Sequence, residues 1–302
     1  VRWYSIPNLF RYERPQRGRL REHWQLNCDI FGADDYTADV EIIALAYQII
    51  MNFGAEANLF AIHINDRAEM RTKYAALGVT ATETQDAITR LNDRFHKISA
   101  DEYKADLKEI VGDNAIVEAV YTLVSGGDTT DTNKVVDGLR ELGIENVKID
   151  RSIARGFNYY TGTIFEIFDV SGENNRSMLG GGRYDNLTGM FSADPISGIG
   201  FGMGDVTMRD FLETHDLLTS SITAPTVMVI PMEADQNLAA QKIAMEIRRK
   251  EITVATDIGT RKLGKKISDA AERLVEYIIV VGEDELASGT YTLKNLIEES
   301  EV

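Results

Sequence analysis

The chain has 302 residues, of which 44% are hydrophobic and 26% are charged, and its formal net charge is −16. This composition fits a globular protein long enough for two domains with cores of their own, and it excludes a disordered chain. The single cysteine, Cys28, excludes a disulfide framework and suits a core position in a reducing compartment. No secretory pattern and no apolar run of about 18 residues is present, so we expect a cytoplasmic protein without a membrane partner. The acidity disfavours DNA and indiscriminate nucleic-acid binding.

The start of the chain reverses this acidic background. Residues 1–25 carry six arginines against two acids. Apolar-rich runs at residues 3–10 and 23–31 flank a connection containing proline and glycine, which predicts a long antiparallel hairpin. Guanidinium groups pair with phosphate oxygens, so the hairpin is suited to a polyanion. A solvated charged turn is the alternative.

The next part of the chain alternates between helical and extended patterns. Residues 37–53 have the apolar spacing of an amphipathic helix that ends at Gly54, and residues 59–64 alternate as a strand. Residues 67–124 are polar and helical, with a capping-box pattern at residues 99–102. We then expect a turn cluster at 125–131, a helix at 133–142 and a strand at 147–150.

Glycine and β-branched residues dominate the stretch that follows. Residues 153–170 predict a strand. The three glycines at 180–182 predict a turn that permits positive φ and a close approach to a ligand. Beyond Pro225 the chain predicts a small α/β domain with a partly parallel sheet, with strands at 227–230, 253–256 and 277–281 and helices at 234–250 and 263–274.

Three ordered signatures resemble histidyl-tRNA synthetase, a class II aminoacyl-tRNA synthetase. Residues 10–19, Phe-Arg-Tyr-Glu-Arg-Pro-Gln-Arg-Gly-Arg, resemble motif 2. Residues 155–166, Arg-Gly-Phe-Asn-Tyr-Tyr-Thr-Gly-Thr-Ile-Phe-Glu, and residues 180–185, Gly-Gly-Gly-Arg-Tyr-Asp, resemble the two histidine-specific signatures. Residues 197–204 resemble the glycine strand of motif 3, but Thr207 stands where that motif usually has an arginine, and Arg209 lies two positions further on.

The resemblance implies an α+β fold with two domains. Residues 1–222 would form a class II antiparallel β-sheet catalytic domain with a helical insertion near 67–124, and residues 223–302 an α/β anticodon-binding domain. The family's insertion reaches the tRNA acceptor arm, although a plain packing role fits this one equally well. The family carries a dimer motif and an amino-group loop before this point. We therefore expect an N-terminally truncated chain that is inactive by itself and a homodimer when intact.

The implied reaction is histidine activation. A histidine–tRNA ligase activates L-histidine with ATP to histidyl-adenylate and transfers it to tRNA(His), with Mg²⁺ arriving on ATP and no tightly held cofactor or metal site. The resemblance places Arg11 on the α-phosphate, Glu13 on the adenine amino group and Arg19 on the γ-phosphate. His23 would stack on adenine, although simple packing also explains it. Arg155 would hold the histidine carboxylate and the α-phosphate together, which makes Arg155 and Arg11 the catalytic candidates.

The remaining candidates concern histidine and tRNA. Selectivity for histidine needs buried partners for both ring nitrogens. The resemblance assigns the imidazole to Asp29 and Tyr160, and other histidine contacts to Gln25, Tyr159 and Tyr184. Residues 242–273 carry nine Lys or Arg against five acids. From this stretch we predict a tRNA-binding set, namely Arg261, Lys265 and Lys266. The solvated face of a helix is the alternative.

Two other functions compete with the ligase. One is the catalytically inactive, synthetase-like regulatory subunit of ATP phosphoribosyltransferase, which typically lacks the C-terminal α/β domain and loses the arginines of the site. The chain keeps Arg11, Arg155 and that domain, which favours the ligase. The other is a plain RNA-binding module, which the net charge disfavours.

Overall fold

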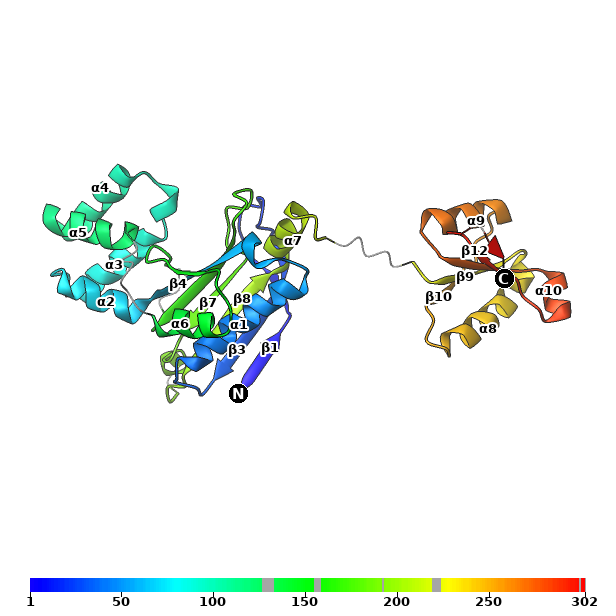
Figure 1. Cartoon of the computed structure of the whole chain (residues 1–302), viewed down its shortest axis with the longest axis horizontal. Helices are drawn as coiled ribbons and strands as arrows, with labels where there is room; N and C mark the ends of the chain where they lie inside the picture. Colours follow the sequence, from blue (N-terminus) through cyan, green and yellow to red (C-terminus); the bar gives the residue numbers. More distant parts are fainter. Residues whose placement is uncertain (127–132, 155–158, 192, 219–223, 299, 302) are drawn as a thin grey trace. The chain divides into compact units, whose positions relative to one another are not determined.

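The computed structural model describes residues 1–126, 133–154, 159–191, 193–218, 224–298 and 300–301. The chain divides into two compact units, Val1–Leu218 and Thr219–Val302 (Figure 1). Each unit has hydrophobic core clusters of its own. The domain boundary expected between residues 222 and 223 lies outside the described residues.

An eight-stranded sheet forms the centre of the first unit, in the order β1-β3-β8-β7-β6-β4-β5 with β2 beside β3. Every pairing is antiparallel except that of β4 with β5. The strands are β1 (Arg2–Ser5), β2 (Asn8–Phe10), β3 (Glu22–Phe31), β4 (Phe60–Asp66), β5 (Val147–Ile149), β6 (Thr163–Asp169), β7 (Leu179–Arg183) and β8 (Gly198–Gly204).

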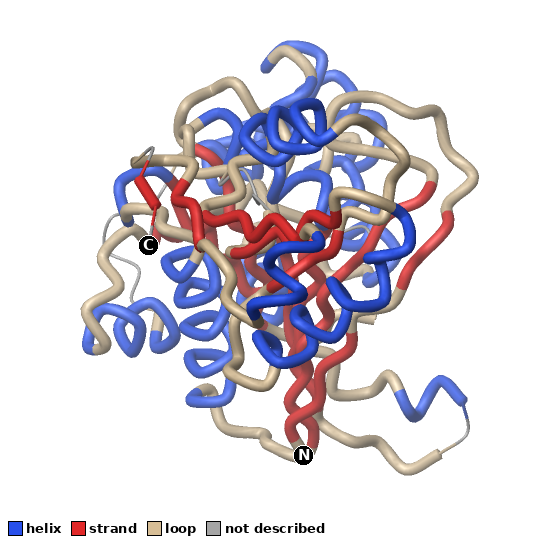
Figure 2. The backbone as a smooth tube through the Cα atoms, turned by 90° about the vertical axis from the view of Figure 1, so that its right-hand side faces the viewer, coloured by secondary structure: helices blue, strands red, loops and turns tan. Residues whose placement is uncertain are grey.

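The predicted N-terminal hairpin is confirmed, because both β1 and β2 pair antiparallel with β3. Figure 2 shows β1 starting at the marked N-terminus and running beside β3. The first arm is divided at Pro7, since proline has no N–H for the ladder. The Pro7 carbonyl still accepts a hydrogen bond from Gln25 N at 3.2 Å. The two short strands therefore act as one arm.

Three helices pack on one face of this sheet, and the main core lies between them. They are α1 (Thr37–Asn52), α6 (Lys134–Glu141) and α7 (Asp205–Thr214). The predicted helices at 37–53 and 133–142 are thus confirmed, and Gly54 follows α1 with φ 90°. Cys28 is 6% exposed within this core, as expected. A buried ion pair between Arg183 of β7 and Asp39 of α1 also joins the two layers.

The helical insertion forms a bundle with a core of its own. Its helices, which gather together at one end of the sheet (Figure 1), are α2 (Arg67–Ala76), α3 (Thr82–Asn92), α4 (Ala100–Val111) and α5 (Asn114–Ser125). Only half of the predicted capping box forms. Ser99 Oγ accepts from Glu102 N at 3.2 Å, but the Glu102 carboxylate pairs with Arg94 instead of returning to the cap. Most of the predicted turn cluster at 125–131 lies outside the described residues.

Two predictions about extended segments were wrong. Of the strand expected over 153–170, residues 155–158 lie outside the described residues, and the strand that the structure describes is Thr163–Asp169. Before it, Thr161 Oγ1 donates to the Asp185 carboxylate at 2.9 Å in a turn. The glycines at 180–182 form part of strand β7 and not a turn. A Cβ added at Gly181 would lie 2.0 Å from the Gly200 carbonyl oxygen. These glycines are therefore used for close strand packing and not for positive φ.

The second unit is a five-stranded sheet in the order β10-β9-β11-β12-β13. Its first three strands are parallel and the remaining pairings are antiparallel, which confirms the partly parallel sheet. The elements are β9 (Val227–Pro231), η4 (Ala234–Gln236), α8 (Asn237–Arg248), β10 (Val254–Thr256), α9 (Leu263–Glu272), β11 (Tyr277–Val281), α10 (Glu283–Ser288), β12 (Leu293–Asn295) and β13 (Ser300–Glu301). No helix within the described part of the chain is long and apolar enough to cross a membrane.

Candidate active site

The face of the main sheet opposite α1 carries a floor without side chains. In the ladder between β3 and β8, Gln25 lies opposite Gly204, Asn27 opposite Gly202 and Asp29 opposite Gly200. The next ladder pairs Gly200 with Gly182 and Gly202 with Gly180. Residues directly opposite in a ladder point to the same face. We call this set the glycine floor, namely Gly180, Gly182, Gly200, Gly202 and Gly204.

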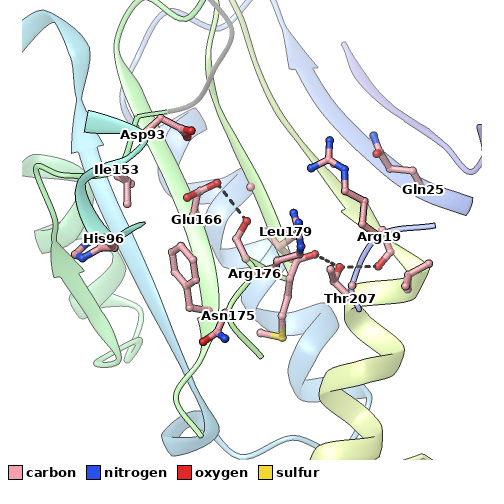
Figure 3. Close-up of a pocket in the computed structure, with 18 of the residues that line it drawn as sticks. Arg19, Gln25, Asp93, His96, Ile153, Glu166, Asn175, Arg176, Leu179 and Thr207 are labelled. Atoms are coloured by element: carbon pink, nitrogen blue, oxygen red, sulfur yellow. Dashed lines mark hydrogen bonds between the residues drawn. The ribbon is translucent and has the colours of Figure 1, made fainter. Parts of the chain in front are cut away.

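A cavity of about 820 Å³ lies over part of this floor, at Gly180, Gly202 and Gly204. The N-terminal hairpin, the insertion, the connection between β6 and β7 and the start of α7 all contribute to its wall. Figure 3 shows Arg19 and Gln25 on one side of the cavity, and Asp93 and His96 on the other. Arg11, Arg19, His23 and Gln25 line the cavity, whereas Glu13, Asp29, Tyr159, Tyr160 and Tyr184 do not.

Arg11 and His23 meet at the wall of the cavity. His23 belongs to β3, is 6% exposed, and its Nε2 contacts Arg11 Nη2. Because Arg11 can only donate, His23 Nε2 is the acceptor. Burial and the Arg11 charge lower the pKa of His23, which keeps the ring neutral as this bond requires. His23 Nδ1 is buried without a hydrogen-bond partner among the described residues, so one polar atom at the wall is unsatisfied.

Glu13 and Arg19 pair across the turn of the hairpin. The Arg19 guanidinium binds the Glu13 carboxylate, and this bond lowers the pKa of Glu13. The backbone groups of Gln16 and Arg19 also bond to each other, both at 2.9 Å, which closes the turn. The turn therefore presents Arg19 to the cavity with its positive charge already paired with the Glu13 carboxylate.

The predicted imidazole-binding residues gather further along β3. Asp29 lies about 13 Å from Gln25, taking about 3.3 Å of strand rise per residue. The Tyr184 hydroxyl donates to Asp29 Oδ1, and the ring of Tyr159 lies 4.7 Å from Tyr160 and 5.9 Å from Tyr184, centroid to centroid. Burial raises the pKa of the Asp29 carboxyl, and the bond from Tyr184 opposes that rise. An acidic group among tyrosines is suited to a polar aromatic ligand.

Glycines of β7 and β8 make room for these side chains. A Cβ at Gly200 would lie 2.1 Å from Asp29 Oδ1, and one at Gly182 would lie 2.8 Å from Tyr160 Cδ1. Gln25, midway along β3, donates to Asn27 at 2.6 Å and lies over Gly202. The glycine floor thus extends along β3 from near His23, which contacts Arg11, to Asp29.

Arg155, the leading catalytic candidate, lies outside the described residues. Thr207 does line the cavity, and its hydroxyl donates to the Met178 carbonyl at 2.9 Å. Arg209 is not among the lining residues. Its side chain is 68% exposed and pairs with Glu213 on the next turn of α7. Arg209 therefore does not bring an arginine to the place of Thr207.

A series of hydrogen bonds that no sequence pattern indicated joins the insertion to the sheet. His96 of the insertion bonds to Ser152 Oγ at 2.7 Å, and Ser152 donates to Asp150, whose other oxygen lies 2.7 Å from His63 Nδ1. The His63 and Ser152 bonds lower the pKa of Asp150 against the opposing effect of burial. His96 and Ser152 both line the cavity. Because His96 and Ser152 lie far apart in the chain, no local sequence pattern could predict their contact.

In the second unit, one of the three predicted tRNA contacts is misplaced. Lys266 is 3% exposed, and its Nζ donates to the Pro231 carbonyl at 2.8 Å, so it cannot reach a phosphate. It lies on the buried face of α9, where both its stem and its ammonium group are inside the second unit. Arg261 and Lys265 are 51% and 58% exposed, but both pair with Asp269.

The described part of the chain holds no cluster of three or more His, Cys, Asp or Glu side chains that could bind a metal ion.

Comparison with known proteins identifies the family. The profile described as histidyl-tRNA synthetase matches residues 1–205, and the profile described as anticodon binding domain matches residues 226–302. The histidine–tRNA ligase of Leptospira biflexa is 39% identical to the chain, over 98% of the chain and 71% of that protein.

Solved structures share the fold. A histidyl-tRNA synthetase from Nostoc sp. PCC 7120 has a TM-score of 0.80 at 23% identity and covers 100% of this chain and 75% of its own. An ATP phosphoribosyltransferase regulatory subunit/histidyl-tRNA synthetase from Bacillus halodurans has a TM-score of 0.69 at 21% identity, covering 89% of this chain and 71% of its own.

The antiparallel sheet with its glycine floor and arginine-lined cavity, together with these matches, places the chain among the class II aminoacyl-tRNA synthetases, a class of ATP-dependent aminoacyl-tRNA ligases. Within that class it belongs to the histidyl-tRNA synthetase family.

Proposed function

We propose that the protein is a histidine–tRNA ligase, which activates L-histidine with ATP and transfers it to tRNA(His). The observation that carries the proposal is the face of β3. One end of this strand presents His23 beside Arg11 and Arg19, and the other end presents Asp29 bound to Tyr184. Phosphates fit the first end because guanidinium groups bind them in pairs. An imidazole fits the second because Asp29 can accept from a ring N–H.

In the first step a carboxylate oxygen of histidine attacks the α-phosphorus of ATP. A bond forms between that oxygen and phosphorus, the bond to the bridging oxygen breaks, and pyrophosphate leaves. Arg11 stabilises the charge that develops on the α-phosphate, and Arg155 holds the carboxylate beside it. Positioning and charge stabilisation account for most of the catalysis in such a displacement. Mg²⁺ arrives with ATP on the phosphates.

Adenine and histidine are selected by separate groups of residues, some of which line the cavity and some of which lie beyond its lining. Glu13 accepts from the adenine amino group, His23 stacks on the ring, and Arg19 contacts the γ-phosphate. The imidazole is bound by Asp29 and Tyr160, with Gln25, Tyr159 and Tyr184 as the other contacts. In the second step the terminal ribose hydroxyl of tRNA attacks the histidyl carbonyl carbon, and AMP leaves as the acyl bond to the ribose forms. We also propose that the intact protein is a homodimer.

Histidine-dependent exchange of pyrophosphate into ATP tests the proposal. Arg11→Ala and Arg155→Ala should each reduce exchange by about 10²-fold or more, since each removes a charged donor used in the transition state. Arg14→Ala is the matched control, because Arg14 is exposed, belongs to the same loop and does not line the cavity. It should stay within about twofold of the unchanged protein. These measurements use the intact protein, and no histidine-dependent exchange in the intact protein without substitutions would favour the regulatory subunit instead.

A further inference from the structure

Among the residues that the structure describes, three guanidinium groups line the cavity, and the third comes from a segment that no sequence signature covers. Arg11 and Arg19 belong to the hairpin, whereas Arg176 belongs to the connection between β6 and β7. Arg19 is paired with Glu13, and Arg11 faces a neutral ring nitrogen of His23. Within the described part of the chain, Arg176 has neither an ion pair nor a hydrogen bond to its side chain. Arg11 and Arg176 therefore line the cavity without a paired carboxylate, although the protein has a net charge of −16.

Arg176 lies between the turn of the hairpin and the start of α7. A Cβ built on Gly18 would be 2.9 Å from Arg176 Cδ, and 3.6 Å from Thr207 Cγ2. Gly18 has φ 72°, so both its backbone conformation and the side chain against it favour glycine there. The side chain of Arg176 therefore packs beside Thr207, where Arg209 does not reach.

The connection that carries Arg176 is held from two sides. Asn174 Nδ2 donates to Asp169 at 2.7 Å and to Thr214 Oγ1 of α7 at 3.0 Å, and its Oδ1 accepts from Arg17 Nη2 at 3.2 Å. Asp169 in turn binds His215 Nε2 at 2.9 Å. These bonds tie the connection to α7 and to the hairpin. Two residues after Asn174, the backbone of Arg176 therefore has a defined place at the wall.

The positive charges of Arg11, Arg19 and Arg176 lie near one another at the cavity wall and repel one another. Burial and the charges of Arg19 and Arg176 lower the pKa of Arg11. A bound polyanion would relieve this repulsion, and a guanidinium is the group best matched to phosphate oxygens. The turn residue next to Gly18 is Arg19, which the proposed function assigns to the γ-phosphate.

We propose that Arg176 binds the terminal phosphates of ATP and supplies the cation that Thr207 does not. This assignment rests on the proposed function, because it takes ATP as the polyanion in the cavity. Arg176 is a binding residue for the distal end of the nucleotide, so it should affect ATP affinity and leave histidine binding unchanged.

Calorimetric titration of the full chain with Mg·ATP and with AMP tests the assignment. Arg176→Ala should raise the Kd for Mg·ATP by about 10- to 100-fold, the range expected for losing a hydrogen bond between charged groups. The Kd for AMP, which lacks the terminal phosphates, should change by less than about twofold. Arg176→Gln, which keeps the side chain as far as Cδ, the atom that lies against Gly18, should behave like the alanine variant and guard against a packing effect.

Arg209→Ala is the matched control, because Arg209 is an exposed arginine near Thr207 that pairs with Glu213. It should leave both dissociation constants unchanged. Unchanged ATP affinity in Arg176→Ala, or an equal loss for ATP and AMP, would overturn the assignment. Both of those results leave histidine-dependent pyrophosphate exchange in the unchanged protein intact. Absence of that exchange would instead overturn the proposed function.

Discussion

At the scale of single residues, Asp29 combines a buried carboxyl with a proposed role in substrate choice. Burial raises the pKa of Asp29 above its ordinary value. A carboxyl whose pKa is higher in the folded protein than in the unfolded chain loses its stabilising contribution as the pH rises through the folded pKa. Keeping Asp29 ionised at neutral pH therefore costs stability, which the hydrogen bond from Tyr184 partly offsets.

Asp29→Asn should consequently separate stability from activity. At pH 7 the variant should melt at or above the temperature of the unchanged protein, and this gain should disappear as the pH falls toward about 4, where an ordinary Asp becomes protonated. The KM for histidine in pyrophosphate exchange should rise by about 10- to 100-fold, because an amide offers one acceptor where two were available. A lower melting temperature at pH 7 with unchanged KM would contradict both arguments.

Tyr184→Phe is the companion variant. It keeps the edge-to-face contacts of the ring with Phe31 and Tyr159 but removes the bond to Asp29. Because that bond lowers the pKa of Asp29, its removal should steepen the loss of stability between pH 4 and pH 7. Melting curves of the two variants across this range check the sign.

The positions of some candidate residues could be predicted from the sequence, and those of others could not. Arg11, Arg19, His23 and Gln25, which the family resemblance singled out, all line the cavity. His23 and Gln25 do so together because a strand places alternate residues on one face. Arg176 was missed because it lies in a polar connection without periodicity, and only the folded chain brings it against Gly18. Lys266 was misassigned because a count of charges does not separate the two faces of a helix.

At the scale of elements, the close contact of β7 with β8 depends on the absence of side chains. Gly181→Ala should destabilise the first unit by about 2 kcal/mol or more, because its Cβ would lie 2.0 Å from the Gly200 carbonyl oxygen and cannot be accommodated without moving a strand. Urea unfolding followed by tryptophan fluorescence measures the change.

Gly204→Ala is the matched substitution in the neighbouring strand. Its Cβ would meet only Thr207 Oγ1, at 3.7 Å. This variant should lie within about 1 kcal/mol of the unchanged protein. Equal losses of unfolding free energy at the two positions would contradict this argument. They would mean that alanine is unfavourable in these strands in general, and not because β7 and β8 approach each other closely at Gly181.

Helices were easier to predict than strands. The spacing of apolar residues and the end of the pattern at Gly54 were enough to locate α1. The strand β7 was mistaken for a turn because a glycine run carries no alternation, and its extended conformation comes from pairing with β6 and β8. The pairing partners lie elsewhere in the chain, so local sequence did not contain this information.

At the scale of the whole molecule, we propose that the second unit binds tRNA and takes no part in adenylate chemistry. Its profile match, described as anticodon binding domain, supports this division. Arg261 and Lys265 are its exposed candidates, but both already pair with Asp269. A phosphate would have to compete with that carboxylate, which limits the gain from each contact.

Replacing Arg261 and Lys265 together with alanine should raise the Kd for tRNA by about 3- to 10-fold and lower the salt slope of log Kd by about 1 to 2. Pyrophosphate exchange should remain normal, since no residue of the cavity changes. Lys266 is left in place, because its removal would unpair a buried carbonyl. Arg249→Ala, an exposed arginine of the same unit paired with Glu246, serves as the control. Unchanged tRNA binding in the double variant would mark this region as an ordinary solvated helix face.

The glycine floor also limits how this cavity could be given a new substrate. Protein engineers usually enlarge or narrow a pocket by trimming or extending the side chains beneath the ligand, and this floor has none to trim. Extending it is equally restricted, because a methyl group at Gly200 or Gly202 would collide with Asp29 or Gln25. Under the proposed function, a change of amino-acid preference must therefore be made at side chains that lie beside the floor, such as Asp29 and Tyr184, while the floor stays as it is.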